Sequence, residues 1–107
     1  MSAAQGAGAP PNVEIKVRLP ENVAAGVYAN SMMVQHTGDE FVMDFIVAVA
    51  GTGSVVARVI TNPPHMKRVL AALQDNVKKY ESVFGAIRTG PEPTIKVVFH
   101  PSDEARA

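Results

Sequence analysis

The sequence predicts an α+β fold in which an antiparallel β-meander packs on one long amphipathic α-helix. Two observations lead to this prediction. Apolar residues recur at steps of three and four between residues 62 and 85, which is the period of one face of a helix. Apolar runs with turn signals between them fill residues 27–61, as expected for successive strands of a meander.

The helix over residues 62–85 has recognisable ends. Asn62 is a favourable N-cap, Pro63 suits the first helical position, and Gly85 is placed to stop the helix. The residues of one apolar stripe are Met66, Val69, Leu70, Leu73, Val77, Tyr80 and Phe84. We expect this stripe to pack on the sheet.

The register of the meander follows from its turns. Residues 27–49 read as a hairpin around Gly38-Asp39, with Thr37 opposite Glu40 and His36 opposite Phe41. A second turn near residues 50–53, closed as a three-residue loop, places Asp44 opposite Arg58. The chain then runs directly into the helix.

Two further strands are predicted to flank the meander. Residues 13–19 alternate strictly between apolar and charged side chains, which is typical of a strand with one buried face, and Pro20 ends this strand. Residues 94–99 alternate more weakly and predict a last strand that either closes the sheet or crosses to a neighbouring subunit.

Because side chains alternate along strands, the predicted register separates two faces of the sheet. Face one is strongly apolar and suits the helix: Tyr28, Met32, Val34, Phe41, Met43, Phe45, Val47, Val49, Val55, Ala57 and Val59. Face two combines Ala29, Met33, Val42, Ile46, Val56 and Ile60 with Ser31, Gln35, Asp44 and Arg58. One helix covers only one face, so the apolar content of face two predicts an interface with a second copy of the chain, formed by Ala29, Met33, Val42, Asp44, Ile46, Val56, Arg58 and Ile60.

Length and composition indicate one small cytoplasmic domain. The 107 residues predict a single domain over residues 13–100, with an N-terminal tail over residues 1–12 and a C-terminal tail over residues 101–107. Ten basic and ten acidic residues balance, so no overall field attracts nucleic acid. The absence of cysteine excludes disulfides and thiolate chemistry, and we find neither a secretory signal nor an apolar run long enough to cross a membrane.

The residues suited to chemistry do not form a recognised site. His36, His65 and His100 lack further metal donors at ligand spacing, so we predict no catalytic residues, cofactor or metal, although a role for His36 or His65 at a subunit boundary stays open. Asp44 lies in an apolar strand, where it is either an acid or base with a raised pKa or the partner of Arg58. We favour the ion pair.

Lys67, Arg68, Lys78 and Lys79 make the polar side of the helix locally basic. No aromatic residues for base stacking are interleaved with them, so a solvated face is favoured over a nucleic-acid footprint. This basic surface is nevertheless our alternative functional candidate if symmetry repeats it across a dimer.

Two stretches, YANSMMVQHTGDEFVMDF and PPHMKRVLAALQDNVKKYESVFGAI, resemble the DUF3467 family of small bacterial and archaeal proteins of unknown function. The resemblance covers residues 13–87, and the positions that carry it are Tyr28-Ala29-Asn30, His36-Thr37, Glu40-Phe41, Asp44-Phe45, Pro64-His65, Asn76, Tyr80-Glu81 and Phe84-Gly85. It implies a fold but no catalytic residues. The order of sheet and helix is also similar to that of SecB-type export chaperones, by architecture and not by motif.

We therefore expect a non-enzymatic, homo-oligomeric module, at least a dimer, that assembles with itself and offers a groove to a protein or peptide client. The alternatives are a nucleic-acid-associated protein and an enzyme or metal protein assembled from His36, His65 or Asp44 at a subunit boundary.

Overall fold

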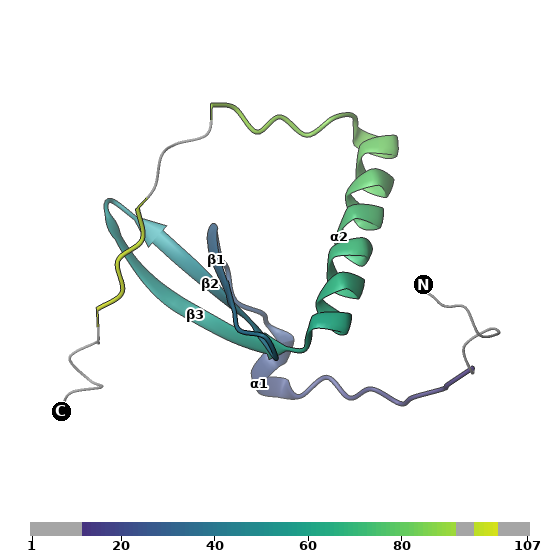
Figure 1. Ribbon diagram of the computed structural model, residues 1–107. Coiled ribbons are helices and arrows are strands. Elements are labelled where there is room, and N and C mark those ends of the chain that lie inside the picture. Colours follow the sequence, from purple (N-terminus) through teal and green to yellow (C-terminus); the bar gives the residue numbers. More distant parts are fainter. Residues whose placement is uncertain (1–11, 92–95, 101–107) are drawn as a thin grey trace. The chain divides into compact units, whose positions relative to one another are not determined.

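The computed structural model describes residues 12–91 and 96–100 and confirms the α+β class (Figure 1). The elements in chain order are α1 (Glu21–Ala24), β1 (Ser31–His36), β2 (Phe41–Val49), β3 (Thr52–Thr61) and α2 (Pro63–Phe84). The chain divides into two compact units, Met1–Thr61 with the sheet and Asn62–Ala107 with the long helix. The single domain over residues 13–100 stays a prediction.

The sheet has the strand order β1-β2-β3 with both neighbouring pairs antiparallel. The first hairpin has the predicted register, with His36 opposite Phe41 and the Thr37 amide donating to the Glu40 carbonyl over 2.9 Å. The Thr37 hydroxyl accepts from the amides of Asp39 and Glu40, both at 3.2 Å, and so supports the turn from inside. On the other side of β2, Asp44 lies opposite Arg58 as predicted.

The second hairpin reaches this register by a different route from the one predicted. Its turn contains two residues, Ala50 and Gly51, because Val49 pairs directly with Thr52. The shorter turn shifts the partners of residues 46–49 by one position from those predicted. A bulge between Phe45 and Ile46 then absorbs one residue of β3, so that residues 41–45 have their predicted partners. Ile46 of face two is therefore paired with Val55 and not with Val56. The predicted three-residue loop and the predicted place of Val55 on face one were wrong, because paired residues lie on the same face of a sheet.

The tight turn places an alanine in an unfavourable backbone conformation. Both turn residues have positive φ, 54° at Ala50 and 83° at Gly51, as primed hairpin turns require. Glycine adopts this region without steric cost, but the Cβ of Ala50 opposes it.

Replacing Ala50 with asparagine should raise the free energy of unfolding by about 1 kcal/mol, because asparagine tolerates positive φ and Asn-Gly favours this turn. Denaturant unfolding at one fixed protein concentration measures the change. The control is Ala50→Val, whose branched Cβ should lower stability. A less stable Ala50→Asn protein would contradict the assigned turn.

Helix α2 confirms the predicted ends. The Asn62 side chain accepts a hydrogen bond from the His65 amide over 2.8 Å, and two prolines occupy the first turn. Gly85, with a φ of 89°, follows the last helical residue and donates its amide to the Glu81 carbonyl over 2.9 Å. On the apolar stripe the rings of Tyr80 and Phe84 contact one another one turn apart in a tilted arrangement, with centroids separated by 4.9 Å.

The predicted flanking strands are not observed. Residues 13–19 form no ladder with the sheet, and a short helix, α1, that the sequence did not predict follows them after Pro20. Of the predicted last strand, residues 94 and 95 lie outside the described residues, and residues 96–99 have no regular secondary structure. Alternation specifies which side of a segment is apolar, but a strand also needs an edge to pair with.

The predicted tails lie outside the described residues apart from Asn12. Within residues 12–91 and 96–100, no helix is both long enough and apolar enough to cross a membrane.

Candidate interaction surface

The centre of face two is the ion pair between Asp44 and Arg58 on neighbouring strands. The guanidinium binds the carboxylate in bidentate fashion, with 2.6 Å from Nε to Oδ1 and 2.9 Å from a terminal nitrogen to Oδ2. This geometry is the strong form of such a pair, because both carboxylate oxygens receive a charge-assisted hydrogen bond. The predicted pairing is confirmed.

The two members of the pair differ in their access to solvent. Asp44 is fully buried, whereas 56% of the Arg58 side chain remains exposed. Hydrogen bonding from Arg58 lowers the pKa of the Asp44 carboxyl below its ordinary value, and this outweighs the opposing effect of desolvation. The carboxyl is therefore charged at neutral pH, which does not support the alternative of an acid or base with a raised pKa.

Apolar side chains surround this pair on face two. Met33 on β1 lies directly opposite Asp44, and Val42 pairs with Ile60 next to it. Ile46 is buried, whereas Ile60 on the outer strand is 55% exposed. The other predicted interface residues, Ala29, Met33, Val42 and Val56, are all partly buried.

Asn30 has a structural role that the sequence reading missed. Its side chain accepts from the Ala48 amide over 2.9 Å and donates to the Ala48 carbonyl over 3.0 Å, while its backbone amide donates to the Ile46 carbonyl. The amide side chain thus extends the β1–β2 ladder by one step beyond Ser31. An asparagine directly before a strand was the available signal.

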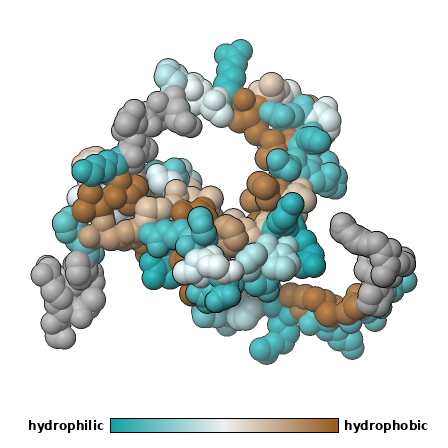
Figure 2. Space-filling view, viewed as in Figure 1, coloured by the Kyte–Doolittle hydropathy of each residue, from teal (hydrophilic) through white to brown (hydrophobic). Residues whose placement is uncertain are grey.

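The sheet has little apolar burial of its own. Among the described residues, Met43 and Ile46 are the buried hydrophobic side chains, both on the central strand β2. Figure 2 shows apolar side chains at the surface of the sheet and of the extended N-terminal segment. On the outer strands, Met32, Val34, Val55, Val59 and Ile60 are each 41–55% exposed.

The basic residues on α2 form a weaker candidate site. Lys67, Arg68, Lys78 and Lys79 are all exposed. Lys79 pairs with Asp75 one turn earlier over 3.2 Å, which reduces the positive charge available to an anionic partner.

The histidines show no ligand geometry. The ring of His36 lies against that of Phe41 with centroids 5.5 Å apart, as expected for neighbours across a hairpin, and the His65 amide is used in the helix cap. In the part of the chain that the structure describes, no three histidine or acidic side chains gather as metal ligands.

The fold and its surface define a small meander-and-helix protein whose sheet carries a buried carboxylate–guanidinium pair. The chain belongs to the DUF3467 family, described as proteins of unknown function, whose model matches residues 1–89. This match confirms the resemblance seen in the sequence. Neither a curated protein nor a solved structure matches the chain.

Proposed function

We propose that this protein is a homo-oligomeric assembly module without catalytic activity, in which face two of one copy packs against face two of another. One observation carries the proposal: both faces of the three-stranded sheet bear apolar side chains, but the described residues contain only one long helix. Wherever α2 lies, it covers at most one face of the sheet. A second copy supplies a self-complementary cover for the other face.

The ion pair suits such an interface. A carboxylate alone would oppose burial, but Asp44 already receives two hydrogen bonds from Arg58. The half-exposed guanidinium carries further N–H groups, and in a two-fold dimer these would meet polar groups of the second copy, such as the amide of Gln35. These hydrogen bonds would fix the orientation of one sheet on the other. Because Arg58 already neutralises Asp44, the contact would bury no unpaired charge.

The assembled module would bind a protein or peptide client through its remaining apolar surface. Met32, which is 51% exposed, belongs to face one. Methionine is flexible and polarisable, so it adapts to partners of different shape. This part of the proposal is secondary to self-assembly and depends on it.

Light scattering coupled to size-exclusion chromatography tests the proposal. We expect a mass of at least twice the 11.3 kDa of the chain at micromolar concentration. The mass should persist in high salt, because apolar contacts are not screened as exposed charge pairs are. A strict monomer across this concentration range would refute the proposal.

A further inference from the structure

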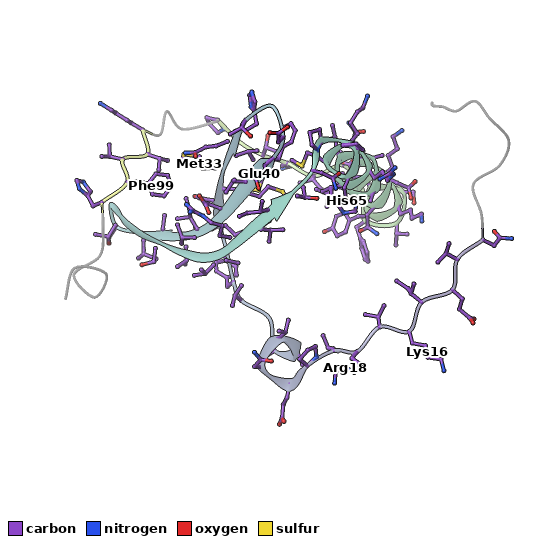
Figure 3. The ribbon with its side chains drawn as sticks, turned by 60° about the horizontal axis from the view of Figure 1, so that its bottom comes forward. Lys16, Arg18, Met33, Glu40, His65 and Phe99 are labelled. Atoms are coloured by element: carbon purple, nitrogen blue, oxygen red, sulfur yellow. The ribbon has the colours of Figure 1, made fainter. Side chains whose placement is uncertain are left out.

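The segment of residues 13–19, the arm, has the pattern of a strand but pairs with none of the three strands of the described sheet. Val13, Ile15, Val17 and Leu19 occupy one side of it and are 70–80% exposed. Glu14, Lys16 and Arg18 alternate with them, and Figure 3 shows Lys16 and Arg18 projecting from the extended arm. Four large apolar side chains in a row are costly to leave in water.

The sheet offers the arm an edge. Strands β1 and β3 are the outer strands, and within residues 12–91 and 96–100 each has one row of backbone groups without a neighbouring strand. An extended segment can add to such an edge through main-chain hydrogen bonds. The seven residues of the arm span roughly 23 Å, which matches the six residues of β1 at roughly 20 Å.

We infer that the arm of each copy pairs with strand β1 of a second copy, so that two chains exchange N-terminal strands. This inference rests on the proposed function, because it requires a homo-oligomer, and it names the residues that would hold the assembly together. Exchange between identical copies closes on itself in a dimer.

Charge favours β1 over β3. With its apolar side on face one, the arm would place Glu14, Lys16 and Arg18 on face two, a net positive charge. There the residues of β1 are Ser31, Met33 and Gln35, which carry no charge, whereas β3 presents Arg58. At the margin of the sheet, the long stems of lysine and arginine allow their charged ends to reach water.

The apolar side of the arm would complete face one. Met32 and Val34 on β1 are 51% and 41% exposed, and no strand of the described sheet flanks them on the outer side. An added strand would set Ile15 and Val17 beside them and exclude water from the outer flank of Met32 and Val34, while the open surface of face one stays accessible. In this contact residues 13–19 would form the strand that their alternating sequence predicts.

The connection between arm and sheet is long enough for exchange. Residues 20–30 separate the two elements and contain the single turn of α1, which the Pro20 carbonyl supports by accepting from the amides of Val23 and Ala24. Packed sheets lie about 10 Å apart, so a connector of this length reaches from one sheet to the edge of the other.

Cysteine crosslinking tests the exchange, because the native chain has no cysteine. The double variant Lys16→Cys/Gln35→Cys joins the centre of the arm to the face-two side of β1. Treatment with a short bismaleimide should give a covalent dimer on a denaturing gel in clearly higher yield than Gln35→Cys alone, which links copies only where two face-two surfaces meet. An internally linked monomer would mean that the arm pairs with its own sheet, and covalent dimers from Lys16→Cys alone would mean that two arms pair with each other; either result would overturn the exchange.

A second measurement separates this inference from the proposed function. Ile15→Asp/Val17→Asp should raise the dissociation constant of the oligomer at least about tenfold, because four apolar side chains per dimer lose their burial. The matched control Lys16→Gln/Arg18→Gln alters the other side of the arm and should leave the constant within about twofold. A monomeric wild-type protein would refute both proposals, whereas an oligomer that the aspartates do not weaken would refute the strand exchange alone.

Discussion

Replacing Arg58 with methionine is expected to lower the melting temperature by at least about 5 °C at neutral pH. Methionine keeps an apolar stem over the sheet but removes the guanidinium that donates to both oxygens of Asp44. The fully buried carboxylate is then left without a partner, which costs far more than an exposed charge would. Thermal unfolding followed by circular dichroism at one protein concentration measures the effect.

The pH dependence of this variant should have the opposite sign to that of the wild type. In the wild type the pKa of Asp44 lies below its ordinary value of 3.8, so its contribution to stability is present above that pH and is lost as the pH falls through the folded-state pKa. Without Arg58, desolvation is unopposed and raises the pKa of this carboxyl. The variant should therefore become more stable as the pH is lowered from 7 towards 5, while the contribution of Asp44 in the wild type should not change over this range.

Two controls identify the ion pair as the cause. Lys79→Ala breaks the exposed pair with Asp75 on α2 and should change the free energy of unfolding by no more than about 0.5 kcal/mol. Asp44→Leu/Arg58→Met removes both charges and should recover most of the lost stability. An Arg58→Met protein with unchanged melting temperature and unchanged oligomer mass would show that the pair does not stabilise the fold or the assembly.

Replacing Ile60 with lysine is expected to raise the dissociation constant of the oligomer by about 1000-fold. Ile60 lies on face two and is 55% exposed in the chain, so the fold of a single copy tolerates a polar side chain there. In the proposed dimer one new cation from each copy would be buried. Arg58 lies on the same face two residues earlier and already engages Asp44, so the strand offers the lysine no anionic partner. Sedimentation equilibrium measures the constant.

Val83→Lys is the matched control for this substitution. Val83 is 72% exposed on α2 and lies outside the apolar stripe, so the same change of charge should leave the oligomer intact. Circular dichroism should show that both variants remain folded. An Ile60→Lys protein that keeps the wild-type mass would exclude face two as the interface.

Several parts of this fold could be predicted because neighbouring residues determine them. Asn62, Pro63 and Gly85 mark the ends of α2 by their own hydrogen-bonding and backbone preferences. The first hairpin likewise has its predicted register, since Gly38-Asp39 sets the turn and all later pairs follow from it. The pairing of Asp44 with Arg58 was also predicted, but from a three-residue loop in place of which the structure has a two-residue turn and a bulge.

Other parts depend on contacts that no local pattern contains. The second hairpin has a two-residue turn at Ala50 and Gly51 followed by a bulge. Beyond the bulge this arrangement gives the same strand pairs as a three-residue loop, so the pattern of the strands could not distinguish the two. The role of Asn30 depends on Ala48, eighteen positions away. Residues 13–19 alternate as a strand does, yet the structure shows no ladder for them.

For this protein, the sequence by itself determined the three strands of the meander, the capped helix α2 and the two faces of the sheet as far as the bulge, because periodicity and capping are local properties. Only the tertiary structure decided that Asp44 is buried under a bidentate arginine, that a bulge offsets a tight turn, and that the arm has no partner within its own sheet. Burial and strand pairing join residues distant in the chain, and an alternating segment carries no mark of the edge it will pair with.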